Sequence, residues 1–176
     1  MRNCTRYNMR TMRNYTQHSC KPSVWAALLC HKGLIMPNHC CNTLTVAKEA
    51  MPVIIQNYIR LDEKGERYFD FELIEPVGDI ADWYKERLAK WGTKWPGYDL
   101  SIGESAIDFF TAWSPPLPII KKLAELHKDF VFRIEYYETG NVFRGIFTAK
   151  WQDGEVRIEE KEWNMTDKDF EELSLS

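Results

Sequence analysis

The chain has 176 residues and 14% aromatic side chains, enough for one domain with a sizeable hydrophobic core. No apolar run approaches the ~18 residues that a membrane-spanning helix needs, so we expect no membrane partner. The net charge of −3 conceals an uneven distribution, because residues 36–176 carry 17 basic against 26 acidic residues, a net charge of −9.

The first 35 residues differ from the rest of the chain. They contain no acidic residue and six basic ones: Arg2, Arg6, Arg10, Arg13, Lys21 and Lys32. A secretory signal is one interpretation, but its apolar stretch at residues 24–29 is shorter than the ~7–15 residues of a typical signal. A basic arm that binds nucleic acid is a second interpretation. We favour a disordered extension or a mis-assigned start, because the globular pattern begins directly after Met36-Pro37-Asn38.

The five cysteines do not form a metal-binding pattern. Cys20, Cys30 and Cys40 are evenly spaced and histidines lie near them, but no C-x2–4-C or H-x3–5-H pair occurs. We therefore predict no metal and no cofactor. An odd number of cysteines without a secretion signal is typical of free thiols in the cytoplasm, where we expect this protein.

The regular pattern begins at Asn42. Residues 42–46 alternate between polar and apolar side chains, which predicts a first strand. Residues 47–60 have apolar side chains at helical spacing and predict a helix with Pro52 in its first turn. After a turn at residues 64–66, alternating apolar and acidic side chains at residues 69–73 predict a second strand.

Residues 79–90 predict a helix that is capped at its first residue. Its inward stripe comprises four side chains: Ile80, Trp83, Tyr84 and Leu88. A loop at residues 91–99 follows, and residues 106–113 predict a third strand. Ser114-Pro115 is typical of an N-cap and first helical residue, so we expect the next helix to start there and end near residue 127.

Three more strands are predicted near the end of the chain. Alternating aromatic side chains at residues 130–136 and 143–151 predict the first two, and Asp153-Gly154 predicts a tight hairpin into the third. The acidic tail at residues 167–176 is expected to be a loose helix. The whole pattern, β-α-β-(α)-β-α-β-β-β, predicts one α+β ferredoxin-like sandwich at residues 36–166, with helices on one face of a mostly antiparallel sheet.

Four separated motifs resemble a known family. Met36 to Val46 (MPNHCCNTLTV), Trp91 to Trp95 (WGTKW), Thr111 to Pro116 (TAWSPP) and Glu135 to Glu138 (EYYE) are similar, in this order, to the YubB ferredoxin-like domain family. The resemblance covers residues 36–151 and implies a ferredoxin-like fold, a cytoplasmic setting and an origin on plasmids, phages or prophages. It implies no reaction. Two features depart from the family: His39 replaces its usual tryptophan, and residues 1–35 have no counterpart.

The tryptophan loop, residues 91–99, is the first candidate for a binding surface. Tryptophan is rarely left in a loop unless it anchors something, so we expect Trp91 and Trp113 to lie in the core and Trp95 to be more exposed. Lys94 is expected either to pair with a nearby acid or to form a cation–π surface with the rings.

The EYYE motif contains the other candidates. Glu135 and Glu138 are acid–base candidates near Lys94, although we favour a solvated Glu135, alternating with Arg133, that is a cross-strand ion partner. Strand alternation places one ring of Tyr136-Tyr137 in the core and the other on the open face. No catalytic residue is assigned, and the candidate binding surface comprises Trp91, Thr93, Lys94, Trp95, Trp113, Glu135, Tyr137 and Glu138.

Three functions compete at this stage. A non-enzymatic module that binds a host or plasmid protein is favoured, because an acidic domain with aromatic anchors suits a protein partner. A nucleic-acid-binding domain that uses sheet aromatics is the second hypothesis, disfavoured by the acidic charge and the absence of a basic stripe outside residues 1–35. The third is a small hydrolase or nuclease centred on Glu135, Glu138 and Lys94.

Overall fold

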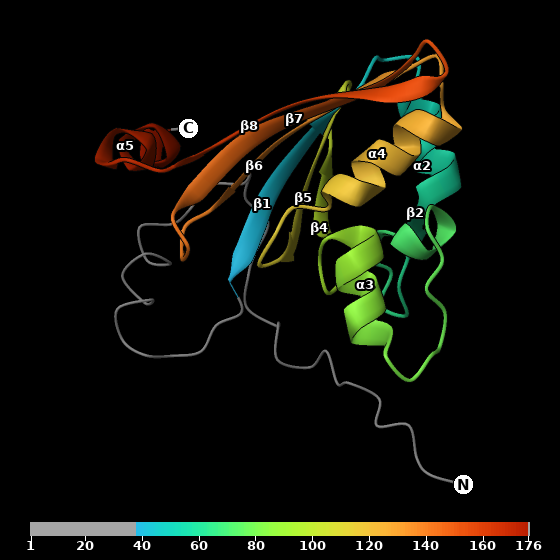
Figure 1. Ribbon diagram of the computed structural model, residues 1–176. Helices are drawn as coiled ribbons and strands as arrows, with labels where there is room; N and C mark the ends of the chain where they lie inside the picture. Colours follow the sequence, from blue (N-terminus) through green and yellow to red (C-terminus); the bar gives the residue numbers. More distant parts are fainter. Residues whose placement is uncertain (1–37, 176) are drawn as a thin grey trace, which may run out of the picture.

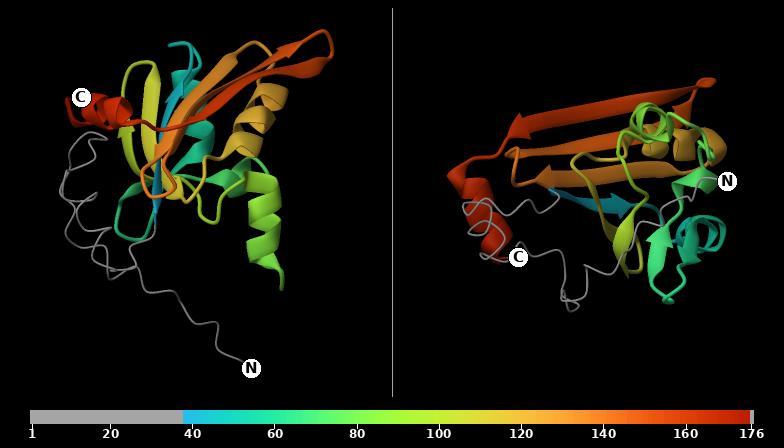
Figure 2. Two further views of the ribbon diagram at one scale, coloured as in Figure 1. Left: turned by 60° about the vertical axis from the view of Figure 1, so that its left-hand side comes forward. Right: turned by 90° about the horizontal axis from the view of Figure 1, so that it is seen from below.

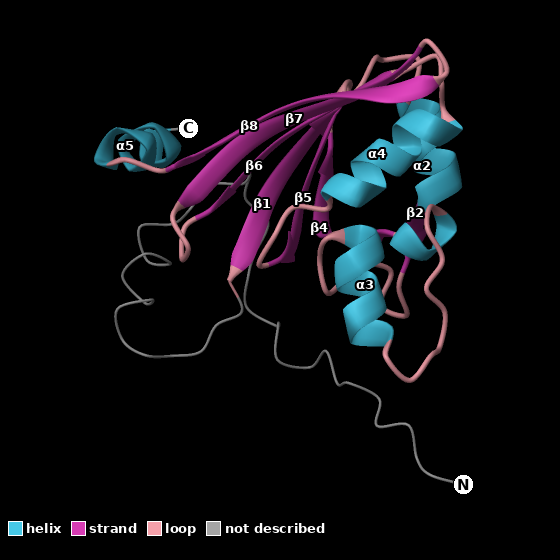
Figure 3. Ribbon diagram, in the orientation of Figure 1, coloured by secondary structure: helices cyan, strands magenta, loops and turns pink. Residues whose placement is uncertain are grey.

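The computed structural model describes residues 38–175, so the predictions for residues 1–35 lie outside the described part of the chain (Figures 1 and 3). Its elements, in chain order, are β1 (His39–Thr45), α2 (Met51–Tyr58), β2 (Ile59–Leu61), β3 (Arg67–Phe69), the 3-10 helix η2 (Phe71–Leu73), α3 (Trp83–Trp91), β4 (Tyr98–Ile102), β5 (Ala106–Ala112), α4 (Leu117–Leu126), β6 (Val131–Glu138), β7 (Phe143–Gln152), β8 (Glu155–Asn164) and α5 (Asp167–Leu175).

The six-stranded sheet has the order β4-β5-β1-β6-β7-β8, and every neighbouring pair is antiparallel. Two split β-α-β units interlock in it: β1-α2-β4 encloses β5, and β5-α4-β6 encloses β1. This is the ferredoxin-like arrangement. The predicted α+β fold with a largely antiparallel sheet is therefore confirmed.

Two additions extend this arrangement. The long hairpin β7-β8 continues the sheet beyond β6, and Asp153 and Gly154 at its tip both have positive φ, 54° and 89°. These angles are typical of the tight hairpin turn that the Asp-Gly pair predicts. The second addition is the segment between α2 and β4, which contains the β2-β3 hairpin, η2 and α3.

The hydrophobic core lies between the sheet and helices α2, α3 and α4, which cover one face (Figures 1 and 2). Alternate residues of β1, β5 and β6 are buried on that face, including Leu44, Phe109 and Ile134. The opposite face of the sheet is the open face. Within the described residues, no helix is long and apolar enough to cross a membrane.

The predicted second strand at residues 69–73 is wrong beyond its first residue. β3 ends at Phe69, and a 3-10 turn follows because Asp70 Oδ1 accepts a hydrogen bond from the backbone N–H of Glu72 at 3.1 Å. Aspartate competes in this way with regular strand pairing. The apolar alternation therefore reflects two buried phenylalanines, Phe69 at the end of β3 and Phe71 at the start of η2.

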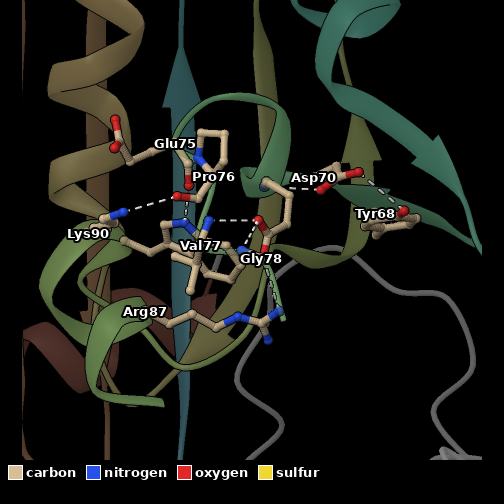
Figure 4. A network of polar contacts seen from close by, with 10 residues as sticks. Tyr68, Asp70, Glu75, Pro76, Val77, Gly78, Arg87 and Lys90 are labelled. Atoms are coloured by element: carbon tan, nitrogen blue, oxygen red, sulfur yellow. Dashed lines mark hydrogen bonds and ion pairs between the residues drawn. The ribbon is translucent and has the colours of Figure 1, made fainter. Parts of the chain in front are cut away.

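The predicted inward stripe of residues 79–90 is wrong at three of its four residues. Only Trp83 of the four residues packs against the core; Ile80, Tyr84 and Leu88 are exposed, and the helix buries Trp91 at its last residue. Polar contacts hold this helix against the preceding segment (Figure 4). Glu72 accepts hydrogen bonds from the backbone N–H groups of Val77 and Gly78, and from Arg87 at 3.2 Å, so α3 needs no broad apolar face.

Helix α4 begins two residues later than its sequence predicts. Its N-cap is Pro116, and Ser114 does not cap it. The Ser114 hydroxyl instead donates a hydrogen bond to the carbonyl oxygen of Gly92 at 2.5 Å. Ser114 therefore fastens the start of this helix to the tryptophan loop.

Candidate functional site

Trp91 is the buried anchor of the tryptophan loop, as predicted. It has no exposed surface, and its indole N–H donates a hydrogen bond to the carbonyl oxygen of Glu75 at 2.7 Å. Phe71 meets its ring edge-on, and the Arg87 guanidinium lies 4.4 Å from its ring centroid. These contacts fix the point at which α3 ends and the loop begins.

Gly92 and Thr93 attach the loop to the sheet. Gly92 ends α3 at φ 78°, and a Cβ there would lie 2.8 Å from the Pro118 side chain and 3.0 Å from a backbone oxygen. The buried Thr93 hydroxyl donates to the carbonyl oxygen of Ala112 at 2.9 Å and accepts from its N–H at 3.2 Å. Thr93 therefore satisfies both backbone groups of the last residue of β5.

Trp113 lies outside the core, which contradicts the prediction. The strand ends at Ala112, and the backbone of Trp113 turns into the left-handed region at φ 66°, so its side chain leaves the alternation and is 37% exposed. A bulky residue is strained in this conformation. The N–H of Trp113 donates to the Asn38 carbonyl oxygen at 2.9 Å, and Thr111 donates to the Ser114 carbonyl oxygen at 2.7 Å. These bonds hold the strained residue in place.

Lys94 gathers three aromatic rings around its ammonium group. Its Nζ lies 4.9 Å from the ring centroid of Trp95, 5.3 Å from that of Trp113 and 5.6 Å from that of Tyr84. Trp95 and Trp113 stack at 6.4 Å with an interplanar angle of 26°. All three distances are within the ~6 Å at which a cation is attracted to the face of a ring. We call these four residues the Lys94 cluster.

Of the two alternatives predicted for Lys94, an acidic partner or a cation–π surface, the described residues contain the second. Among the described residues, no carboxylate oxygen lies within 4.0 Å of its Nζ. Tyr84 is exposed, while Lys94 and Trp95 are half-buried. The cluster therefore presents a positive charge and three rings at the surface.

The residues of the EYYE motif separate onto two faces of β6. Glu135 and Tyr137 lie on the open face, whereas Tyr136 and Glu138 are buried on the helix side. Glu135 is partly exposed, as predicted, but its ion pair is with Arg133 of the same strand and not with a residue of a neighbouring strand. Strand alternation thus prevents Glu135 and Glu138 from acting on one substrate as a pair.

Glu138 has a structural environment. One of its carboxylate oxygens accepts a hydrogen bond from the N–H of Gly140 and the other from the N–H of Asn141, each at 2.6 Å. The side chain is 1% exposed. It closes the β6-β7 turn, and no contact with the Lys94 cluster joins it to the tryptophan loop.

His39, which replaces the family's usual tryptophan, packs among rings on the open face. Its ring meets Tyr98 and Phe110 edge-on, and Nδ1 lies 2.6 Å from the Tyr98 hydroxyl. Burial lowers the pKa of His39, opposed by the negative charge of Asp99. Burial is also the main cause that raises the pKa of Tyr98. This aromatic group was not predicted, because residues from β1, β4 and β5 meet only in the sheet.

Tyr84 is the member of the Lys94 cluster that the sequence did not indicate. Its helical spacing with Ile80 and Leu88 suggested an inward position, whereas the short α3 turns this side toward solvent. The described residues also contain no group of three or more His, Cys, Asp or Glu side chains that could hold a metal ion.

Comparison with known proteins supports the fold. Residues 90–174 match the model of a family described as a ferredoxin-like domain in Api92-like protein. No curated protein and no solved structure matches the chain. The family match and the sheet order agree that the chain contains an α+β ferredoxin-like domain. The narrower resemblance to the YubB family stays a prediction.

Proposed function

We propose that this ferredoxin-like protein is a non-enzymatic binding module that engages a host or plasmid protein through the tryptophan loop. The motif resemblance further supports a cytoplasmic accessory protein of a plasmid or phage, related to the YubB family. The surface that we assign to the partner is the Lys94 cluster.

The strained and exposed Trp113 carries this proposal. A left-handed backbone costs an ordinary residue about 1–2 kcal/mol, and Trp113 in this conformation still leaves 37% of its surface exposed. Such strain is characteristic of functional sites. The hydrogen bonds of Thr93, Thr111 and Ser114 keep the segment rigid, so its ring is presented in one position. A preorganised aromatic side chain loses little conformational entropy on binding.

The chemistry of the cluster indicates an acidic and partly apolar partner surface. The Lys94 ammonium has no carboxylate partner among the described residues, so an aspartate or glutamate of the partner would complete its interactions. The rings of Trp95 and Trp113 would cover apolar groups beside that acid. Tryptophan is enriched among the residues that contribute most to protein interfaces.

The hydrolase alternative has less support. It requires Glu135, Glu138 and Lys94 to act together, yet the two carboxylates lie on opposite faces of β6 and each is occupied by its own partners. General acid–base catalysis needs the reacting groups within hydrogen-bonding reach of one site.

Affinity capture from a bacterial lysate tests the proposal. The full chain is the bait, beside a Lys94→Ala/Trp95→Ala variant and a matched control, Lys128→Ala/Trp151→Ala, which removes another lysine–tryptophan contact of 4.1 Å elsewhere on the domain. We expect a protein that the wild type and the control retain and the Lys94 variant loses. Equal recovery by all three baits would assign the cluster a structural role.

A further inference from the structure

The open face of strands β6, β7 and β8 has a different charge from the rest of the domain. Residues that pair directly across an antiparallel sheet share a face, so the register assigns each side chain to one side. The open face of these strands carries five basic side chains, Arg133, Arg144, Lys150, Arg157 and Lys161, and three acidic ones, Glu135, Glu155 and Glu159. Its net charge is +2.

The helix side of the same three strands has the opposite character. It carries Glu138, Glu160 and Glu162 and no basic residue, a net charge of −3. The acidic total of the sequence therefore conceals a basic sheet face, which appears only when the strands are placed in register. Two of the acids on the open face pair with two of its basic residues, Glu135 with Arg133 and Glu155 with Arg157, and the net charge of +2 is unchanged by these pairs.

A row of aromatic side chains crosses the open face beside these charges. The register aligns Tyr98, Phe110, Cys41, Tyr137, Arg144 and Trp163 across all six strands. Neighbouring strands lie ~4.8 Å apart, so the row spans about 24 Å. The guanidinium of Arg144 lies 5.3 Å from the Trp163 ring centroid. The row thus contains four rings and one cation, Arg144, which lies between Tyr137 and Trp163.

The acidic helix α5 is seated at one end of this row. Arg144 donates a hydrogen bond to Asp169 at 2.8 Å and lies 3.6 Å from a carboxylate oxygen of Glu172. The helix carries four acidic residues and one lysine, and it lies on the side of the sheet away from α2, α3 and α4 (Figures 1 and 2). Two carboxylates of the chain itself therefore occupy a site suited to an anionic ligand.

We propose that the open sheet face binds single-stranded nucleic acid and that α5 competes for it through Asp169 and Glu172. Phosphates would contact Arg144, Lys150 and Lys161, and bases would stack on Tyr137 and Trp163. This site is separate from the Lys94 cluster, and the inference goes beyond the proposed protein partner.

A single-stranded nucleic acid suits this face better than a polyanion without bases, because its bases can stack on the rings. Single-strand binding proteins combine a positive surface with rings on which successive bases stack, and both elements occur here in adjacent strands. A duplex hides its base faces and would leave Tyr137 and Trp163 unused. A purely electrostatic ligand would not need them either.

Fluorescence anisotropy with labelled oligo(dT) and oligo(U) of about 15 nucleotides tests the proposal on the full chain. Asp169→Asn/Glu172→Gln removes the competing carboxylates, and we expect roughly tenfold tighter binding than for the wild type. Adding Tyr137→Ala or Lys161→Gln to that background should weaken binding again, by about tenfold for the ring. Lys128→Gln, which changes a lysine on Trp151, serves as the charge control and should have no effect.

Each other outcome overturns the proposal. Binding that Asp169→Asn/Glu172→Gln does not tighten removes α5 as a competitor, and binding that Tyr137→Ala does not weaken places the nucleic acid elsewhere on the chain. Equal binding of heparin or of phosphatidylserine vesicles, insensitive to Tyr137→Ala, would identify a plain anion-binding surface. None of these variants changes the Lys94 cluster. A negative result here therefore does not bear on the proposed protein partner, which the affinity capture tests separately.

Discussion

Trp91 and Trp113 belong to two motifs that are joined by the hydrogen bonds of Thr93 and Ser114, yet their environments are opposite. Trp91 is fully buried, hydrogen-bonded and enclosed by Phe71 and Arg87, whereas Trp113 is 37% exposed on a strained backbone. Thr93 and Ser114 connect the two regions. The comparison teaches that the two tryptophan motifs have different roles. Trp91 stabilises the core beneath the loop, and Trp113 is held on the surface above it.

Replacing Trp91 gives the largest expected effect on stability. Trp91→Ala should lower the free energy of unfolding by about 3–5 kcal/mol, because it removes a large buried ring and leaves a cavity. Urea denaturation followed by circular dichroism measures the loss. Trp113→Ala is the matched control and should cost less than about 1.5 kcal/mol. Similar losses of unfolding free energy in both variants would show that Trp113 is a structural residue like Trp91.

The two glutamates of β6 extend the same comparison to charged residues. Glu138→Ala should cost about 2–3 kcal/mol, because it removes the two hydrogen bonds that the buried carboxylate accepts from the N–H groups of Gly140 and Asn141. Glu135→Ala should change stability by no more than about 0.5 kcal/mol, since its ion pair with Arg133 is solvated. The same denaturation measurement applies, and a costly Glu135→Ala would contradict this division of β6.

His39 provides a test by pH. Burial lowers its folded pKa below the ordinary value of 6.5, so the folded state favours the neutral ring. The contribution of the neutral His39 ring to the free energy of unfolding is complete above pH 6.5. It is lost as the pH falls through 6.5 toward the folded pKa. Stability should therefore decline between about pH 7 and about pH 5, before most carboxylates protonate.

A His39→Gln variant should show a shallower decline over this range in thermal unfolding. Some dependence should remain, because burial also lowers the pKa of His127. An unchanged slope in the variant would show that the surroundings of His39 do not disfavour its charged form.

Trp113→Gly should have a smaller effect on stability than Trp113→Ala. Glycine accepts φ 66° without strain, which offsets the loss of the ring's contacts with Trp95 and Lys94. We expect a net change within about 1 kcal/mol, measured by thermal unfolding. A loss of several kcal/mol would assign Trp113 to the structural frame.

The sequence predicts the regular parts of the fold because local patterns determine them. Most of β1 and β5 to β8, the Asp-Gly hairpin and the first turn of α2 with Pro52 follow from alternation, turn chemistry and the fixed φ of proline, whereas β2 and β4 were not predicted. The predicted strands are wrong where a side chain, and not a neighbouring strand, forms hydrogen bonds with the backbone. Asp70 ends β3, and Thr93 takes the backbone groups of Ala112, so Trp113 leaves the strand pattern that its spacing suggests.

The candidate surfaces were harder to predict, because they depend on which strands and helices become neighbours. Trp95 and Lys94 were indicated by their motif, but Tyr84 joins them from the exposed side of a short helix. The basic open face depends on the register of three strands. In a linear count the charged residues of these strands sum to −1, and they separate into a positive and a negative face only in the folded sheet.

Capture by a folded Trp113→Gly variant tests the central claim most directly, because it separates display of the ring from stability. The wild-type chain and Trp113→Gly are used as baits at a temperature where both are folded, and the retained proteins are compared. We predict that a protein bound by the wild type is absent from the variant. Equal retention of that protein by both baits would contradict the assignment of the Lys94 cluster as a binding surface.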